Sequence, residues 1–327
     1  MHREIKCGIT RALVTVAFAV MAMVVPSGRP NDGPSKTESA CTDHGQTGTL
    51  ESSVRCEDGP KNGPLPVSTE KEKRKKQSFF RAWFALADRV QATQPDWLSP
   101  LATTSGRLKQ EFRYDIWDQP ATGGNRLYQF GGNKGLEFIT SSRTQLLVGL
   151  PTYDLESPKG PAGFGDLPLM LKFRIASAEK REGNYLLTFL LSANVPTGSD
   201  HYGSHQAVLT PSLAAGKGWG RFDVQTTFGA NLPTGDIPKL GRQLQWNTAF
   251  QYRTLWKLWP ELEVNSTFYE AGKDAGDKQV FLTPGLGFGR MRLSRDLRFS
   301  SAVGMQIAAT SFHLYNHRWM FSTRLSF

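Results

Sequence analysis

The sequence contains no apolar stretch long enough to cross a membrane as a helix. Its longest mainly apolar run, Ala12–Pro26, has 15 residues, whereas a transmembrane helix needs about 20. Only 39% of the residues are hydrophobic, which excludes a bundle of membrane helices. Because the basic residues Arg3 and Lys6 precede the run, we predict a secretory signal peptide over residues 1–30. An uncleaved N-terminal anchor is the alternative.

Cysteine is scarce, with three residues in the chain. Cys7 lies in the predicted signal peptide and would be removed with it on export. Two cysteines, Cys41 and Cys56, would then remain. A disulfide between them would close a short loop and contribute about 3 kcal/mol of stability in the chain-entropy model. Such a bond persists only in an oxidising compartment. Free thiols in a flexible segment are the alternative.

Residues 31–77 have no periodic apolar pattern and are rich in Pro, Gly, Ser, Lys and Glu. This composition predicts a disordered periplasmic segment. The chain carries a formal charge of +10, and the run KEKRKK at Lys71–Lys76 supplies part of it. A basic balance can indicate nucleic-acid binding. No recognition-helix, zinc or RNP-like motif accompanies it here, so we expect no nucleic-acid partner.

Residues 78–106 predict an amphipathic helix followed by a lead-in segment. Apolar residues recur at helical spacing, Ser78 is a candidate N-cap and Pro95 closes the helix. The apolar positions are Phe80, Trp83, Phe84, Ala87 and Val90. Two placements remain open: the helix lies on a membrane surface, or it packs at the mouth of the domain that follows.

From residue 107 to residue 327 the apolar pattern has period two, which is typical of β-strands whose two faces meet different media. In the first run Phe112, Tyr114 and Ile116 share one face, and charged residues share the other. Twelve such runs occur, at residues 107–117, 132–140, 143–150, 164–176, 184–195, 206–215, 219–231, 243–254, 258–269, 279–291, 296–309 and 318–327.

Short and long connections alternate between these runs, as in bacterial outer-membrane barrels. The repeats NVPTGSD at Asn194 and NLPTGD at Asn231 end two runs, because Pro cannot donate to a strand ladder and Gly permits a turn. The last strand ends in Phe327, an aromatic residue at the place that barrel-assembly machinery recognises in such proteins. We therefore predict an all-β fold, a twelve-stranded antiparallel transmembrane outer-membrane β-barrel over residues 107–327, preceded by a short N-terminal helix and a disordered N-terminal segment.

The polar face of the runs carries many ionisable residues, which favours a wet lumen over the dry core of a soluble β-sandwich or lipocalin-like barrel. Charges in a narrow lumen usually pair across strands. The predicted lumen-lining residues are Lys109, Glu111, Arg113, Asp115, Lys172, Arg174, Arg221, Asp223, Arg253, Glu261, Glu263, Arg298 and Arg324. Whether the lumen is open or plugged is not determined by the pattern.

The stretch GFGDLPLMLKFRI, from Gly163 to Ile175, resembles a strand of the outer-membrane barrels called the MetA-pathway of phenol degradation family. The motif residues are Gly163, Gly165, Asp166 and Leu167. The resemblance covers about residues 108–327. It implies a channel-like barrel that passes small organic compounds, and it does not extend to the segment before the barrel.

Other chemistry has weaker support. His201 with His205, and His313 with His317, lie in predicted loops, where i, i+4 spacing does not align a metal site. Ser204 beside His205 is the nearest approach to a nucleophile and base, but neighbours in a loop do not make that geometry. We expect no cofactor, no metal and no enzymatic activity.

The sequence thus predicts an outer-membrane channel or transporter of a Gram-negative-type bacterium, in contact with outer-membrane lipid, for small organic compounds, aromatic ones among them. The solute is unidentified. The alternatives are a structural or adhesive barrel without transport, and an outer-membrane phospholipase-like enzyme.

Overall fold

The computed structural model of the protein describes residues 79–132, 134–294 and 296–327. The predictions for the signal peptide, the segment 31–77, the Cys41 and Cys56 pair and the Ser78 N-cap lie outside the described residues. Helix α2 spans Phe79–Ala92 and the single-turn helix α3 spans Ile237–Leu240. Among the described residues, no helix combines the length and apolar character needed to cross a bilayer.

Strands make up most of the described chain. Their bounds are β1 Glu111–Pro120, β2 Arg126–Gly131, β3 Gly135–Ile139, β4 Thr144–Gly149, β5 Tyr153–Ser157, β6 Ala162–Phe164, β7 Leu167–Ala178, β8 Tyr185–Val195, β9 Val208–Trp219, β10 Phe222–Pro233, β11 Arg242–Tyr252, β12 Leu258–Ala271, β13 Lys278–Arg292, β14 Arg298–Ala308 and β15 His317–Ser326.

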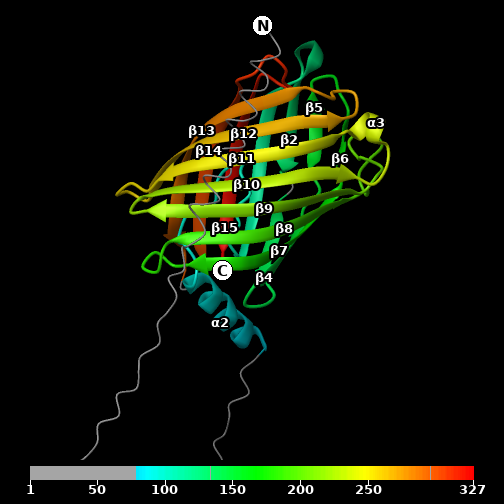
Figure 1. The fold of residues 1–327 in the computed structure, drawn as a ribbon. Coiled ribbons are helices and arrows are strands. Elements are labelled where there is room, and N and C mark those ends of the chain that lie inside the picture. Colours follow the sequence, from blue (N-terminus) through cyan, green and yellow to red (C-terminus); the bar gives the residue numbers. More distant parts are fainter. Residues whose placement is uncertain (1–78, 133, 295) are drawn as a thin grey trace, which may run out of the picture. The chain divides into compact units, whose positions relative to one another are not determined.

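These strands form one antiparallel sheet that closes on itself (Figure 1). Strand β15 pairs with β14 on one side and with β1 on the other, from Glu111 opposite Ser326 to Asp118 opposite Trp319. Strands β2 and β3, β4 and β5, and β6 and β7 are each separated by only a few residues and continue along the same course. Each of these three pairs therefore counts as one strand of the wall, which confirms the predicted twelve-stranded antiparallel barrel.

The structure corrects the predicted length of the first connections. Residues 118–131 and 151–163, expected as loops, contain the end of β1, all of β2 and β5 and most of β6, which extend the wall at its long-loop end. The expected alternation is interrupted at Gly131 and Gly132, both with positive φ, and at Pro151. Because the period-two pattern stops at these residues, the sequence does not indicate that the strands continue beyond them.

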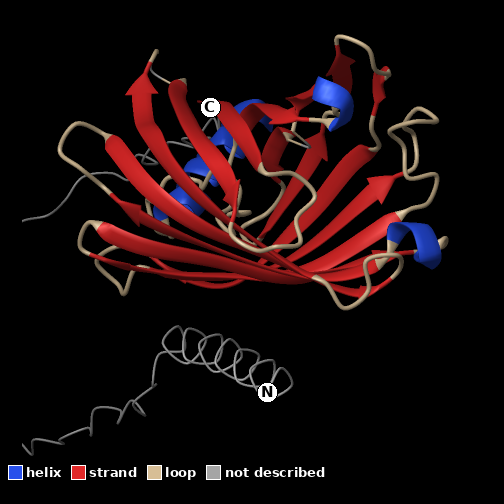
Figure 2. Cartoon of the chain, turned by 90° about the horizontal axis from the view of Figure 1, so that it is seen from above, coloured by secondary structure: helices blue, strands red, loops and turns tan. Residues whose placement is uncertain are grey.

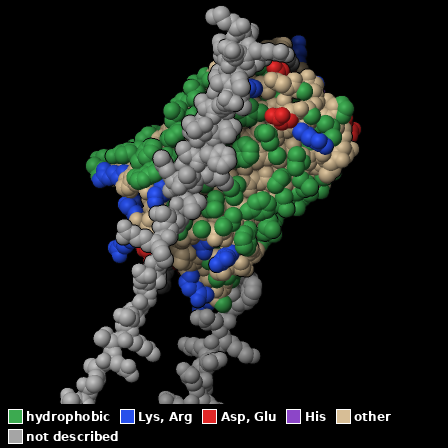
Figure 3. Space-filling view, in the orientation of Figure 1, with side chains coloured by type: hydrophobic (Ala, Val, Ile, Leu, Met, Phe, Trp, Pro, Cys, Tyr) green, Lys and Arg blue, Asp and Glu red, His purple; other side chains and the backbone are tan. Residues whose placement is uncertain are grey.

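The two faces of the wall differ as the period-two pattern predicts. On β15, Trp319 and Phe321 point outward and are exposed, whereas Ser322 and Arg324 point inward and are buried. Figure 3 shows hydrophobic side chains over much of the visible outer wall, with charged side chains gathered toward its ends. An exposed apolar band with a polar interior is the arrangement of a barrel that spans a lipid bilayer.

Helix α2 packs against the end of the barrel that carries the short turns (Figure 1). The indole of Trp83 donates a hydrogen bond of 2.6 Å to the carbonyl of Ile139, the last residue of β3. Ala87 and Val90 are buried in a cluster with Ile139 and Leu108. The helix is thus seated at the barrel mouth, the second of the two placements that the sequence left open.

Candidate functional site

After α2 the chain turns into the barrel, and residues 93–110, here called the plug, lie inside the wall. Trp97, Leu98, Leu101 and Leu108 of the plug are all buried. Figure 2 shows the strands from above, surrounding the interior. Residues 107–110, predicted as the start of the first strand, belong to the plug instead. The N–H of Lys109, for example, donates to the side chain of Gln145 at 2.5 Å.

Basic side chains of the wall donate to carbonyl oxygens of the plug. Arg113 of β1 donates to Leu101 at 2.6 Å and to Pro100 at 3.2 Å. Arg324 of β15 donates to Ser99 at 2.7 Å. The plug has no regular secondary structure, so its buried backbone groups need partners from elsewhere. Charges that the sequence predicts to face water in the lumen are therefore used to hold this segment.

Acidic and neutral side chains complete the contacts between wall and plug. Glu263 of β12 accepts the N–H groups of Ala102 at 2.8 Å and Thr103 at 2.5 Å. Gln225 donates to the carbonyl of Leu98 at 2.9 Å, and Thr188 donates to that of Gly106 at 2.8 Å. Further bonds come from Thr227 to Thr104 and from Lys172 to Ser105. The plug is thus held mainly by polar contacts along its backbone.

Glycine residues on the inner face make room for the apolar side chains of the plug. A Cβ at Gly216 of β9 would lie 2.5 Å from the ring of Trp97, and one at Gly304 of β14 would lie 2.6 Å from Leu101. Real Cβ atoms essentially never approach so closely. Sequence reasoning missed these residues. The signal that could have found Gly216 is glycine at alternate, inward positions in AAGKGW of β9, and the same pattern in GLGFG of β13 contains Gly287, where a Cβ would collide with Leu98 of the plug.

The remaining luminal charges form buried ion pairs near the plug. Lys172 of β7 lies 3.0 Å from Glu137 of β3, across the intervening strand β4. Lys109 lies 3.0 Å from Glu111. On β1, Arg113 and Asp115 are neighbours on the same face, 2.8 Å apart. These pairs neutralise charge inside the wall; Lys172–Glu137 joins two strands as expected, whereas the other two pairs join residues two positions apart along the chain.

Three predicted lumen-lining residues lie elsewhere, at the short-turn rim. Arg221 is exposed in the turn between β9 and β10, and Arg253 is exposed just after β11, 3.9 Å from Asp96. Arg298 is exposed at the first position of β14. The prediction failed because these residues lie at or beyond the ends of their strands, at the rim. There the alternation of inward and outward side chains no longer determines which side chains lie inside the wall.

The other predicted residues lie within the wall or at its mouth. Arg174 bonds the carbonyl of Val90 at 3.1 Å and so holds the end of α2. Asp223 and Glu261 are buried and accept hydrogen bonds from Gln225 at 3.1 Å and Gln251 at 2.6 Å, respectively. The charged part of the interior thus lies toward the short-turn half, around the plug.

Beyond the plug, the inner wall carries mainly amides and hydroxyls. Asn265 accepts hydrogen bonds from Thr283 at 2.9 Å and from Gln306 at 3.0 Å. The loop between β14 and β15 folds onto this region, because the N–H of Leu314 donates to Gln279 at 2.8 Å. This half of the interior, in which hydrogen-bonding amides and hydroxyls predominate, is the candidate solute region.

Aromatic groups also contribute to the solute region. Tyr315 of the β14–β15 loop stacks on Phe281 with ring centroids 4.5 Å apart. The guanidinium of Arg318 lies 4.1 Å from the Tyr315 ring and 4.6 Å from the Trp117 ring. The Tyr315 hydroxyl donates a hydrogen bond to Gln306, and burial raises the pKa of this hydroxyl above its ordinary value. The region therefore combines stacking surfaces with hydrogen-bonding groups.

The glycine-rich motif lies at the long-loop end of the barrel, where it contacts a loop. It takes no part in the hydrogen bonds of the interior described above. Asp166 accepts the N–H groups of Gly198 and Ser204, both at 3.0 Å. The N–H of Leu167 donates to Thr197 at 3.0 Å. A Cβ on Gly163 would collide with Ser199. The motif thus ties the β8–β9 loop, which contains the repeated Pro-Thr-Gly turn, to the neighbouring strand.

His205 and His313 contact groups of their own loops, Ser204 also contacts Asp166 outside its loop, and His317, predicted to lie in a loop, is the first residue of β15. The Ser204 hydroxyl donates to Asp166 and to the carbonyl of Gln206, while His205 lies 3.1 Å from the carbonyl of Asp200. His313 lies 2.6 Å from the side chain of Asn316. Within the described ranges no three His, Cys, Asp or Glu side chains are grouped to hold a metal.

No protein-family model matches the chain, and no curated protein matches it in sequence. Among solved structures it is similar to an outer membrane channel from Pseudomonas putida F1, at 12% identity over 66% of this chain and 94% of the other, with a TM-score of 0.46. The NanC porin is similar at 6% identity, over 65% and 98%, with a TM-score of 0.42. The transport unit of the autotransporter AIDA-I from Escherichia coli is similar at 11% identity, over 75% and 98%, with a TM-score of 0.32. Values this low assign no activity to this chain, so its function is inferred from its own geometry.

Proposed function

We propose that this chain is an outer-membrane channel or transporter of a Gram-negative-type bacterium whose lumen is closed by the plug and opens when the plug moves. The single observation that carries the proposal is the contrast within one barrel. The wall is continuous and locked by backbone pairing, whereas residues 93–110 inside it lack regular structure and are held by side-chain contacts. A segment held in this way can leave its seat without breaking the wall.

The construction of the interior supports displacement of the plug. When the plug leaves, Arg113, Arg324 and Glu263 lose its backbone groups, and incoming water then solvates their charges. A lumen of apolar side chains would instead resist water entry. Helix α2 anchors the plug at the short-turn end, and we infer that a signal from that side can reach the plug.

The solute region supports a class of solute. Its amides suit hydroxyl, amide or carboxyl groups, and the rings of Phe281, Tyr315 and Trp117 offer stacking surfaces. Small aromatic or amphipathic organic compounds match this lining. The resemblance of Gly163–Ile175 to barrels of the MetA-pathway of phenol degradation family points the same way. The exposed apolar band implies outer-membrane lipid as the surroundings, and the aromatic Phe327, which follows β15, suits recognition by barrel-assembly machinery.

The experiment compares two proteins refolded in detergent and placed in planar lipid bilayers. The first is the unaltered chain and the second has residues 95–106 replaced by a Gly/Ser linker of equal length. We expect rare, small openings from the first and sustained conductance from the second. Vesicles that contain the second protein should also take up small phenols and aromatic acids faster than vesicles with the first.

The alternatives predict different results. A structural or adhesive barrel without transport gives no conductance from either protein, although both show heat-modifiable gel mobility. A phospholipase-like enzyme releases fatty acid from the vesicles, and replacement of Ser204 by Ala abolishes the release. Absence of conductance and uptake in the linker protein would sink the proposal of solute passage.

A further inference from the structure

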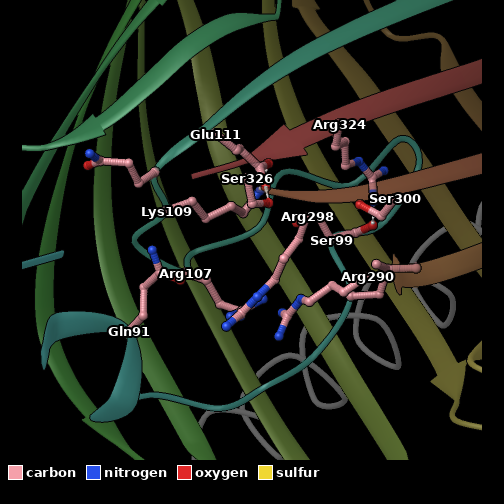
Figure 4. A pocket seen from close by; sticks show the side chains of 12 residues that line it. Gln91, Ser99, Arg107, Lys109, Glu111, Arg290, Arg298, Ser300, Arg324 and Ser326 are labelled. Carbon is pink, nitrogen blue, oxygen red and sulfur yellow. Dashed lines mark hydrogen bonds and ion pairs between the residues drawn. The ribbon is translucent and has the colours of Figure 1, made fainter. Parts of the chain in front are cut away.

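A pocket lies at the short-turn mouth of the barrel, between the plug and strands β13, β14 and β15 (Figure 4). It is open to solvent and narrow, with about 20 Å³ of space that the centre of a water-sized sphere can occupy. Because one water needs about 10–15 Å³ by this measure, the space suits a single small polar group. The pocket is separate from the solute region, and the inference below does not depend on solute passage.

The lining of the pocket is strongly basic. Five of its side chains are cationic and one is anionic. The cationic side chains are Arg107 and Lys109 of the plug, Arg290 of β13, Arg298 of β14 and Arg324 of β15, and the anionic one is Glu111 of β1. Figure 4 shows the guanidinium ends of Arg107, Arg290 and Arg298 directed toward the same space. So many like charges at one place repel one another unless an anion lies among them.

Ion pairs with carboxylates within 4.0 Å account for only two of these cations. Lys109 is paired with Glu111 at 3.0 Å. Arg290 is paired with Asp96, a side chain that is 61% exposed to solvent and thus poorly placed to neutralise the interior of the pocket. An exposed ion pair of this kind is screened by water and contributes little.

The other three cations have no carboxylate partner among the ion pairs of residues 79–132, 134–294 and 296–327, and the terminal carboxylate of Phe327 is in none of these pairs. Arg107 is 5% exposed and Arg324 is 1% exposed. Each donates to a plug carbonyl, yet each has a buried Nε–H with no hydrogen-bond partner. Burial of a charged donor without a partner is unfavourable.

We propose that the pocket is a binding site for a small oxyanion, a phosphate or a carboxylate group, held by Arg107, Arg290 and Arg298. Guanidinium groups match these anions because their planar N–H pairs donate two parallel hydrogen bonds. Arg107 belongs to the plug and Arg298 to the wall. A bound anion therefore links the two and stabilises the seated plug.

The test is isothermal titration calorimetry of the full chain, refolded in detergent, with inorganic phosphate and with benzoate as separate probes. Chloride is present throughout in excess. Saturable binding of one equivalent of either probe supports the site, and the stronger probe tells whether phosphate or carboxylate is its natural class. Lack of saturable binding by both probes overturns the proposal.

Substitutions locate the binding. Arg107→Gln should weaken the stronger probe by at least about tenfold, the effect of losing a hydrogen bond to a charged group. Arg298→Gln, whose side chain is more exposed, should weaken it by a smaller factor without disturbing the plug. Arg221→Gln is the matched control, since it removes an exposed arginine from the same rim outside the pocket. Equal affinity in wild type and both pocket variants, or equal weakening in the control, would show general charge attraction and refute the site.

Discussion

Replacement of Glu263 by Ala should unseat the plug, because this carboxylate is the only acidic group of the described wall that bonds the plug backbone through two N–H groups. Its side chain is fully buried, at 0% exposure. Two hydrogen bonds to a charged acceptor, at about 1.5–3 kcal/mol each, set an upper value of about 3–6 kcal/mol. Glu261 lies two residues away on the same face, so removal of one charge relieves repulsion and lowers this value.

We therefore expect a net loss of about 2 kcal/mol in plug seating, or about 30-fold in the ratio of seated to unseated protein. Planar-bilayer recordings measure this ratio as open probability. Glu263→Gln should give an intermediate value, since the amide oxygen still accepts one N–H but no longer carries a charge. Glu270→Ala, an exposed change on the same strand, is the control. If Glu263→Ala protein shows heat-modifiable mobility but opens no more often than wild type, the plug is not held as described.

Three further predictions follow from the geometry. Gly216→Val places methyl groups where the ring of Trp97 lies, so open probability should rise strongly, and unchanged gating would mean that the ring is not seated there. Asp166→Ala removes the acceptor for two loop N–H groups, so limited proteolysis should cut residues 196–207 several-fold faster while conductance stays similar; a cutting rate like that of wild type would argue against the tether. Phe228→Arg puts a charge on the exposed outer wall, where the side chain is 52% exposed, and should destabilise the barrel in lipid vesicles by about 2–4 kcal/mol. Urea titration followed by gel mobility measures that loss, and a change below experimental error would mean that this face does not meet lipid.

The barrel itself could be predicted from the sequence. In a strand whose two faces meet different media, apolar side chains recur at every second residue. The alternation of Trp319, Phe321 and Thr323 against Met320, Ser322 and Arg324 predicts which side chains point outward, and the structure places them so. The twelve strands and their antiparallel order followed from the same periodicity. It failed locally where glycine or proline interrupts it, as at Gly131 and Pro151, and where strands reach the rim, as at Arg298.

The same periodicity could not show what fills the interior. The sequence of a polar inner face is the same whether that face meets water or the backbone of another segment. Water and a backbone form hydrogen bonds with the same polar side chains. Arg113, Arg324 and Glu263 therefore suggested a wet lumen, although their partners are carbonyl and N–H groups of the plug. The partners lie far from Glu263 and Arg324 along the chain, and no local pattern in residues 93–110 marks them as a plug.

Periodic side-chain alternation by itself thus determined the wall, its twelve strands and the medium on its outer face, since each of these depends on neighbours within a strand. The tertiary structure alone decided that helix α2 sits at the mouth, that the chain turns inward after it, and that five basic side chains from the plug and three strands meet in one pocket. Those features depend on contacts between residues distant in sequence, which form only when the barrel closes around the plug.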